Sequence, residues 1–358
     1  MKKTSLFSTL FAAAILFSTA CKKNESNEQP EDTGREMITG FFKQNGPTFQ
    51  TFTINAGTGG TITTTKGTKF YISPNSLVDA SGNPVTGNVT ISVKEVGTAS
   101  EMIMSDRPAF TGDGKMLQSF GEFFIKAQQG NNDLKLRNDS AIRGNVKPAN
   151  AGAQLPRDIP MWRGDSAVNT STQGYNHDNQ SVTINNTYYV ARGISWDQIV
   201  GNFATFNNGN GGYDFKMDSL ITWRNCDALY NPAGVKTTVM GYFGNSFNTA
   251  TGRSYMGQEP SMLFFKVRNQ NTLVKLYDVI LQPASGKEGL HSYQNTFTVG
   301  EQGTFLAISA KDGKFYAEMR DVTIPAPAPG KNYVPYTFNL AEVSQSTLLN
   351  LIQQMDTK

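Results

Sequence analysis

Residues 305–320 have the sequence FLAISAKDGKFYAEMR, in which two alternating runs flank the dipeptide Asp312-Gly313. Apolar side chains at every second position are typical of a strand with one buried face. An Asp-Gly pair supplies the two positive φ angles that a two-residue type I′ turn requires. These residues therefore predict a β-hairpin and indicate that this part of the chain is built from antiparallel strands.

The same period of two recurs elsewhere in the chain. Residues 89–94 place Val and Ile on one face and polar residues on the other, and residues 213–218 alternate aromatic residues and Met with Asp and Lys. Residues 262–265 are apolar on both faces, which is typical of a central strand. From about residue 44 onward, clusters of Gly, Asn, Asp and Pro separate these runs. The pattern predicts an all-β protein with two β-sandwich-like domains, an irregular connector and a C-terminal amphipathic helix.

The first expected domain resembles the ZU5 family. The segments that carry the resemblance are GGTI at 59–62, ISPNSL at 72–77 and VTGNVTI at 85–91. Ser73 and Asn75 stand where the family more often has Pro and Gly. The resemblance covers residues 53–136, and it implies a β-sandwich that docks onto another protein or another part of the same chain. It does not imply catalysis.

The segment 137–212 is rich in residues that interrupt regular structure, among them Pro156 and Pro160 and the Asn-Gly run 207–212. No long helix is expected across such residues. Tyr188-Tyr189-Val190 predicts a short strand, and the apolar residues of 195–206 have helix-like spacing. We interpret the segment as an irregular connector packed on the first sandwich. The layout resembles uncharacterised Bacteroidota lipoproteins in which a ZU5-like domain precedes a second β-domain.

Residues 339–355 carry apolar side chains at steps of three and four. These residues are Leu340, Val343, Leu348, Leu351, Ile352 and Met355. The spacing predicts an amphipathic helix, with Asn339 as its cap, that closes the C-terminal domain. A helix lying on a membrane surface is the alternative. The polar face holds Ser, Gln and Asn rather than Lys, which favours packing within the protein.

The N-terminus carries the pattern of a bacterial signal peptide. Lys2 and Lys3 precede an apolar run at 6–17, and the small residues Ser18-Thr19-Ala20 come directly before Cys21. This pattern resembles the lipobox of bacterial lipoproteins, although Ser18 stands where an aliphatic residue is usual. The resemblance implies that Cys21 is diacylated and becomes the first residue after cleavage. The alternative is an ordinary secretory signal followed by a chance cysteine.

A lipidated Cys21 anchors the chain to a membrane, because several acyl chains give lasting attachment. The polar residues that follow are expected to form a flexible tether. Their charge resembles the export tags of Bacteroidota surface lipoproteins, and a tether of any origin would also be charged. The expected organisation is a signal peptide at 1–20, a tether at 21–45, a ZU5-like β-sandwich at 46–136, an irregular connector at 137–212 and a C-terminal β-sandwich domain with its terminal helix at 213–358.

The charge and the scarcity of reactive residues limit the classes of function. The formal net charge is +3 and includes Lys2 and Lys3 of the expected signal peptide, so no concentrated basic face for nucleic acid is expected. His177 and His291 lie far apart in the sequence, and no spacing typical of a zinc site or a nucleophile is present. We therefore expect no catalytic residue, cofactor or metal. Cys226 is expected to be a small buried hydrophobic residue.

We hypothesise a non-enzymatic, lipid-anchored protein of the cell envelope that acts in binding, adhesion or assembly. It would sit at the outer membrane, either exposed on the surface or facing the periplasm, and bind a protein or glycan partner. A carbohydrate-binding lipoprotein is the alternative, in which Trp162, Trp196 and Trp223 would stack on sugar rings. Asp139-Ser140-Ala141 and Asp165-Ser166-Ala167 resemble acceptor sites of Bacteroidota O-glycosylation.

Overall fold

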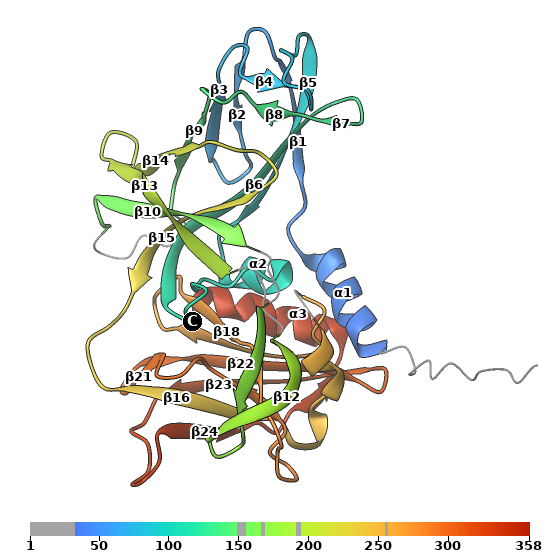
Figure 1. The fold of residues 1–358 in the computed structure, drawn as a ribbon, viewed down its shortest axis with the longest axis vertical. Coiled ribbons are helices and arrows are strands. Elements are labelled where there is room, and N and C mark those ends of the chain that lie inside the picture. Colours follow the sequence, from blue (N-terminus) through green and yellow to red (C-terminus); the bar gives the residue numbers. More distant parts are fainter. Residues whose placement is uncertain (1–32, 149–154, 166–168, 191–194, 255–256) are drawn as a thin grey trace, which may run out of the picture. The chain divides into compact units, whose positions relative to one another are not determined.

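The computed structural model describes residues 33–148, 155–165, 169–190, 195–254 and 257–358. Residues Asp32–Lys358 form one compact unit. Strands dominate its secondary structure, so the predicted all-β class is confirmed (Figure 1). The signal peptide at 1–20 and Cys21 lie outside the described residues.

The largest sheet contains eleven strands. Ten follow one another in the order β1 (Gln50–Asn55), β5 (Asn88–Val96), β6 (Met116–Gln129), β15 (Trp223–Tyr230), β10 (Asp158–Asp165), β13 (Ser195–Asn207), β14 (Gly212–Met217), β9 (Ile142–Val146), β3 (Lys69–Ile72) and β2 (Gly60–Thr63), and β7 (Asn132–Asp133) pairs with β6. β4 (Leu77–Val78) and β8 (Lys135–Leu136) form a separate pair.

This sheet curls around a single core. Phe123 of β6 stacks on Phe215 of β14 with ring centroids 5.2 Å apart, although three strands separate β6 from β14 in the sheet. The Phe215 ring also covers Gly144 on the neighbouring strand, where an added Cβ would lie 2.1 Å from the ring. The alternating apolar residues of β5 contribute to this core, and Val89, Ile91 and Val93 are all buried as predicted.

The segment 137–212 is not an irregular connector, because it contributes β9, β10 and β13 to the large sheet and forms the hairpin of β11 (Asn169–Tyr175) and β12 (Ser181–Val190). The helix-like spacing of apolar residues at 195–206 belongs to a strand, β13. In β13, Gln198 pairs with Trp162 and Phe203 pairs with Pro160, so residues 199–202 bulge out of the ladder. The bulge shifts the alternation and produces apolar spacing that mimics a helix.

The large sheet also crosses the expected boundary at 213, since β14 and β15 belong to it. The rest of the C-terminal segment forms two five-stranded sheets. One has the order β18 (Leu273–Leu276), β17 (Ser261–Val267), β22 (Gln302–Lys311), β23 (Lys314–Thr323) and β25 (Ala341–Val343). The other has the order β19 (Asp278–Val279), β20 (Gly289–His291), β16 (Lys236–Tyr242) and β21 (Phe297–Thr298), with β24 (Tyr333–Thr337) parallel to β16.

Apolar side chains from both sheets meet in one core, which includes Val239 of β16, Phe265 of β17 and Phe305 of β22. The predicted hairpin is confirmed as β22 and β23, in which Lys311 pairs with Lys314. Asp312 and Gly313 have φ angles of 52° and 74°, as the type I′ turn requires. Short 3₁₀ turns, η1 (Gly244–Ser246) and η2 (Thr249–Arg253), follow β16.

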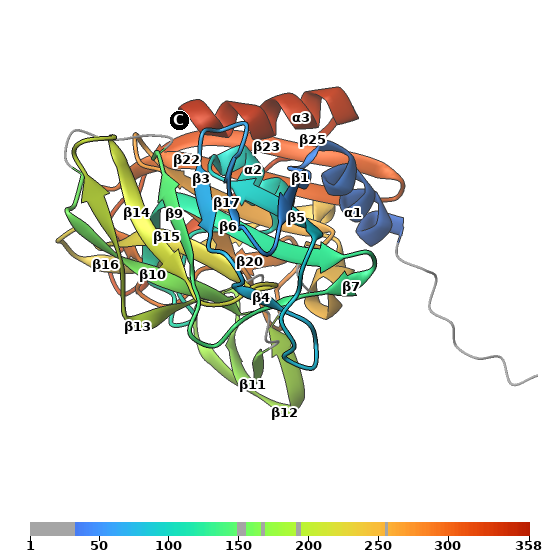
Figure 2. The same ribbon diagram turned by 90° about the horizontal axis from the view of Figure 1, so that it is seen from above.

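Three helices share a further core with β17, β22 and β23. They are α1 (Thr33–Asn45), α2 (Ala99–Ser105) and α3 (Gln345–Gln354), the last continued by η3 (Met355–Thr357). Figure 2 shows α3 lying along β23. The expected tether at 21–45 is therefore wrong over its second part, because Ile38, Phe41 and Phe42 form an apolar stripe that is buried.

The C-terminal helix is confirmed, but it is shorter than expected. It begins at Gln345, with the Ser344 hydroxyl accepting the backbone N–H of Thr347 at 3.1 Å. Residues 341–343 form β25 on the edge of β23 instead. Ser344 caps the helix better than Asn339 because it directly precedes the first turn.

Candidate functional site

A surface pocket of about 380 Å³ lies where three connections of the C-terminal sheets meet. Tyr230 ends β15 and Pro232 follows it in the next connection. Residues 267–270 come from the end of β17 and the turn that follows it, and residues 298–302 run from the end of β21 to the start of β22. Small-molecule sites occupy a few hundred Å³ and lie in such concave regions. We call this feature the β17–β21 pocket.

The polar side chains of the pocket carry both charges. Glu301 is largely buried, its Oε2 accepts the backbone N–H of Thr298 at 3.3 Å, and its Oε1 has no hydrogen-bond partner among the described residues. Burial raises the pKa of Glu301 above its usual value. Burial, followed by the nearby Glu301 carboxylate, raises the pKa of Tyr230 to about 12. Arg268 donates to the Gln302 side chain at 2.9 Å.

These groups can hold a small ligand that both donates and accepts hydrogen bonds. The carboxylate accepts, the guanidinium donates, and the amide of Gln302 does both. Because one acid and one base line the pocket, its charges favour a neutral polar ligand over a strong anion or cation. The ring of Tyr230 adds a partly apolar surface.

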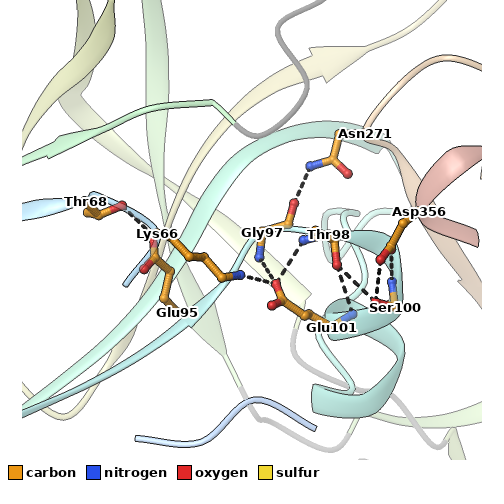
Figure 3. Close-up of polar contacts among 9 residues, drawn as sticks. All are labelled: Lys66, Thr68, Glu95, Gly97, Thr98, Ser100, Glu101, Asn271 and Asp356. Atoms are coloured by element: carbon orange, nitrogen blue, oxygen red, sulfur yellow. Dashed lines mark hydrogen bonds and ion pairs between the residues drawn. The ribbon is translucent and has the colours of Figure 1, made fainter. Parts of the chain in front are cut away.

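A second polar cluster surrounds the first turn of α2 (Figure 3). The sequence Thr98-Ala99-Ser100-Glu101 forms a capping box, in which the Glu101 carboxylate accepts the backbone N–H groups of Gly97 at 2.8 Å and Thr98 at 3.2 Å. Lys66, in the turn between β2 and β3, forms an ion pair with the same carboxylate. The hairpin of an edge strand is thereby fixed to the helix.

The other side chains of this cluster connect segments that are distant in sequence. Ser100 donates from its backbone N and its hydroxyl to Asp356 of η3, at 2.7 and 2.8 Å. Asn271, in the turn after β17, donates to the carbonyls of Gly97 and Ser119 at 2.8 and 2.9 Å. Thr68 donates to Glu95 of β5. The polar groups bind one another, so the cluster stabilises the fold.

Two carboxyl groups inside the protein have strongly raised pKa values. Burial raises the pKa of Glu122 well above its usual value, the Asp227 carboxyl raises it further, and the Arg107 guanidinium lowers it. Neither carboxylate oxygen of Glu122 has a hydrogen-bond partner among the described residues. Burial also raises the pKa of Asp227, which accepts a hydrogen bond from the Asn225 amide. Both residues are completely buried, so a solute cannot reach them in this fold.

The structure does not bring the three tryptophans to the surface. Trp162 and Trp196 are buried, and their indole N–H groups donate to the carbonyls of Asp227 at 2.9 Å and Pro108 at 3.1 Å. Trp223 is half-buried under the Arg107 guanidinium, which lies 4.7 Å from its ring centroid. The alternative in which all three residues form a sugar-stacking platform is therefore wrong.

The remaining residues of interest are scattered. Cys226 is buried as predicted, with its Sγ 3.2 Å from the Met161 Sδ, and burial raises the pKa of its thiol well above the usual value. Asp139-Ser140 lies in an exposed loop before β9, whereas Ser166 lies outside the described residues. In the described part of the chain, no group of three or more His, Cys, Asp or Glu side chains is placed to hold a metal ion.

Sequence reasoning missed the β17–β21 pocket. Most of its residues come from VRNQ at 267–270 and TVGEQ at 298–302, which have ordinary loop composition. Nothing in either segment indicates that the two turns meet.

Comparison with known proteins adds no relative. No family model, curated protein or solved structure matches the chain. None of the helices described here is both long enough and apolar enough to cross a membrane.

Proposed function

We propose that the chain is a lipid-anchored protein of the cell envelope that acts without catalysis, as a binding, adhesion or assembly module at the outer membrane. The observation that carries the proposal is the signal-like sequence ending at Cys21, followed after a short polar segment by the folded unit. The resemblance of residues 53–136 to the ZU5 family supports a docking role.

The start of α1 sets the length of the expected tether. Only residues 22–32 separate Cys21 from Thr33, the first residue of the helix. At about 3.6 Å per residue, these eleven residues span at most about 40 Å when fully extended. An anchor at Cys21 would therefore hold the folded unit close to the membrane surface, which suits a module that binds envelope components.

The location of the perturbed carboxyl groups supports binding rather than catalysis. A catalytic acid or base must touch its substrate. The carboxyls of Glu122 and Asp227 are completely buried in the fold. The accessible pocket is lined by one acidic residue, Glu301, and one basic residue, Arg268, whose charges offset each other.

Carbohydrate binding is the second candidate, now supported by the β17–β21 pocket rather than by tryptophans. Sugars present neighbouring hydroxyls that donate and accept, and an apolar ring face. Glu301, Arg268 and Gln302 match the hydroxyls, and Tyr230 matches the ring face. A panel of soluble oligosaccharides, titrated against the purified chain, tests this candidate, and the absence of binding to every sugar would exclude it.

Fractionation of cells that produce the wild-type chain or the Cys21→Ala variant tests the main proposal. We expect the wild-type chain in the outer-membrane fraction with a fatty-acylated N-terminal peptide, and the variant in soluble fractions or as an uncleaved precursor. An unacylated wild-type chain would refute the anchor. Protease treatment of intact cells then separates the surface from the periplasm, because only a surface protein is digested before the outer membrane is opened.

A further inference from the structure

One lysine and two acidic side chains meet in the interior of the protein, between the end of α2 and strand β18. The Lys275 Nζ lies 2.6 Å from Oδ1 of Asp106 and 3.1 Å from Oε2 of Glu259. The side chains are 2%, 5% and 3% exposed, respectively. Asp106 and Lys275 are 169 residues apart in the sequence. We call these residues the Lys275 triad.

Aromatic rings lie beside the Lys275 ammonium. The Lys275 Nζ lies 4.7 Å from the ring centroid of Tyr277 and 6.0 Å from that of Phe264. The Tyr277 ring packs in turn on Phe110. Asp106 and Glu259 outweigh the effect of burial and raise the pKa of Lys275, while burial raises the pKa of Glu259. The raised pKa makes the Glu259 carboxylate a better acceptor for a proton from the Lys275 ammonium than an exposed carboxylate would be.

The Asp106 carboxyl is placed for attack by this amine. Asp106 is the C-cap of α2 in the left-handed conformation, with φ 49°, which fixes its backbone. Its Oδ1 contacts Lys275, and its Oδ2 has no hydrogen-bond partner among the described residues. The carboxyl can therefore turn about its Cβ–Cγ bond and present Cγ to the nitrogen. Holding a nucleophile and an electrophile in contact removes the largest entropic barrier to their reaction.

From this geometry we infer that Lys275 and Asp106 become joined by an intramolecular amide bond. The Lys275 ammonium first transfers a proton to the Glu259 carboxylate, 3.1 Å away. The resulting neutral Nζ attacks Cγ of Asp106, and a C–N bond forms. One oxygen of the Asp106 carboxyl takes a second proton from the nitrogen and the proton held by Glu259, its C–O bond breaks, and it leaves as one water molecule. No oxidant, reductant or activating group is needed. Glu259 is the catalytic residue because it contacts the reacting nitrogen.

The bond would supply the covalent crosslink that the cysteines cannot. The sequence holds only Cys21 and Cys226, and Cys226 is buried against Met161. An amide between Asp106 and Lys275 would tie the segment after α2 to β18 and close a long loop, which restricts the unfolded chain as a disulfide does. Unlike a disulfide, it is insensitive to reducing agents.

Lys266 provides a matched control. It is also buried, but its Nζ donates to the main-chain oxygens of Val267, Gln270 and Lys358, and no Asp or Glu side chain of the described residues forms an ion pair with it. Lys266 therefore has no aspartate or glutamate side chain to attack.

Mass spectrometry of the digested full chain tests the inference. We expect a crosslinked peptide pair that contains Asp106 and Lys275 and is lighter than the two separate peptides by one water molecule. Fragment ions must locate the bond at these two residues, because Asp-Gly sequences can also lose water. The Lys266→Met variant should keep the crosslinked pair.

Two conservative variants distinguish chemistry from misfolding. Glu259→Gln should keep the fold, judged by circular dichroism, and slow the formation of the crosslink about 100-fold or more. Asp106→Asn should give the same crosslinked product by loss of ammonia. Separate wild-type peptides at their full masses would overturn the inference and leave a plain ion pair, and a Glu259→Gln chain that crosslinks as fast as wild type would overturn the role of Glu259. Neither result depends on lipidation.

Discussion

Replacing Phe41 by alanine tests whether residues 33–45 are a docked helix rather than part of a tether. Phe41 is only 4% exposed, and its ring centroid lies 5.5 Å from that of Phe315 on β23. Truncation of a buried phenylalanine lowers the free energy of unfolding by about 3–5 kcal/mol. Because α1 is the first described element and its neighbours can relax around it, we expect the lower end, about 3 kcal/mol.

The assay is urea denaturation of the full chain followed by circular dichroism, combined with limited trypsin digestion at Lys43. Phe49→Ala is the matched control, since Phe49 lies just after the helix and is 45% exposed. We expect this control to lose less than about 1 kcal/mol. Trypsin should cut Phe41→Ala much faster than the control at Lys43, because the variant releases α1 from β22.

Equal stability of the Phe41→Ala and Phe49→Ala variants would refute the reasoning. Rapid cleavage of the wild-type chain at Lys43 would also refute it, because that residue lies within α1 and a docked helix resists proteases.

Three further predictions concern the interior and the pocket. Because the pKa of Glu122 is raised in the folded protein, its contribution to stability is complete below the unfolded pKa of 4.5 and is lost as the pH rises through the folded pKa. Urea midpoints from pH 4 to 8 should therefore show the Glu122→Gln variant becoming more stable relative to the wild type as the pH rises, and parallel curves would contradict this. Gly144→Ala should lower the free energy of unfolding by about 1–3 kcal/mol, measured by thermal unfolding, because the new methyl group collides with Phe215; an unchanged midpoint would show that the ring moves freely. If a sugar binds the β17–β21 pocket, the Glu301→Gln variant should bind it about tenfold more weakly, measured by calorimetry. The Glu342→Gln variant, changed at an exposed residue, should keep the wild-type affinity, and equal affinities of the two variants would place the sugar elsewhere.

Local patterns in the sequence predicted local structure well. The hairpin of β22 and β23 was predictable because its turn and both strands lie within a few residues of Asp312-Gly313. The strand β17 was predictable because apolar residues on both faces require a packing partner on each face. Phe264 packs in the core shared with the helices, and Phe265 packs in the core between the two five-stranded sheets. In each case, the residues that specify the structure are adjacent in the chain.

The same reasoning failed where strands pair with partners that are distant in the sequence. β15 lies between β6 and β10 in the large sheet, so residues 223–230 join a strand of the expected first domain to a strand of the expected connector. The bulge of β13 gave the apolar residues of a strand the spacing of a helix. The helix α1 was not predicted because only three of its thirteen residues supply its buried apolar stripe. The β17–β21 pocket and the Lys275 triad join turns or segments far apart in sequence, and no linear pattern marks such meetings.

The docking of α1 on β22 constrains the order in which the fold can be completed. The chain is synthesised from its N-terminus, so α1 is made long before β22, which lies in the last quarter of the sequence. Until β22 is made, the side chains of Ile38, Phe41 and Phe42 lack the strand surface on which they pack in the folded protein. The chain therefore completes its fold only after nearly all of it has been synthesised.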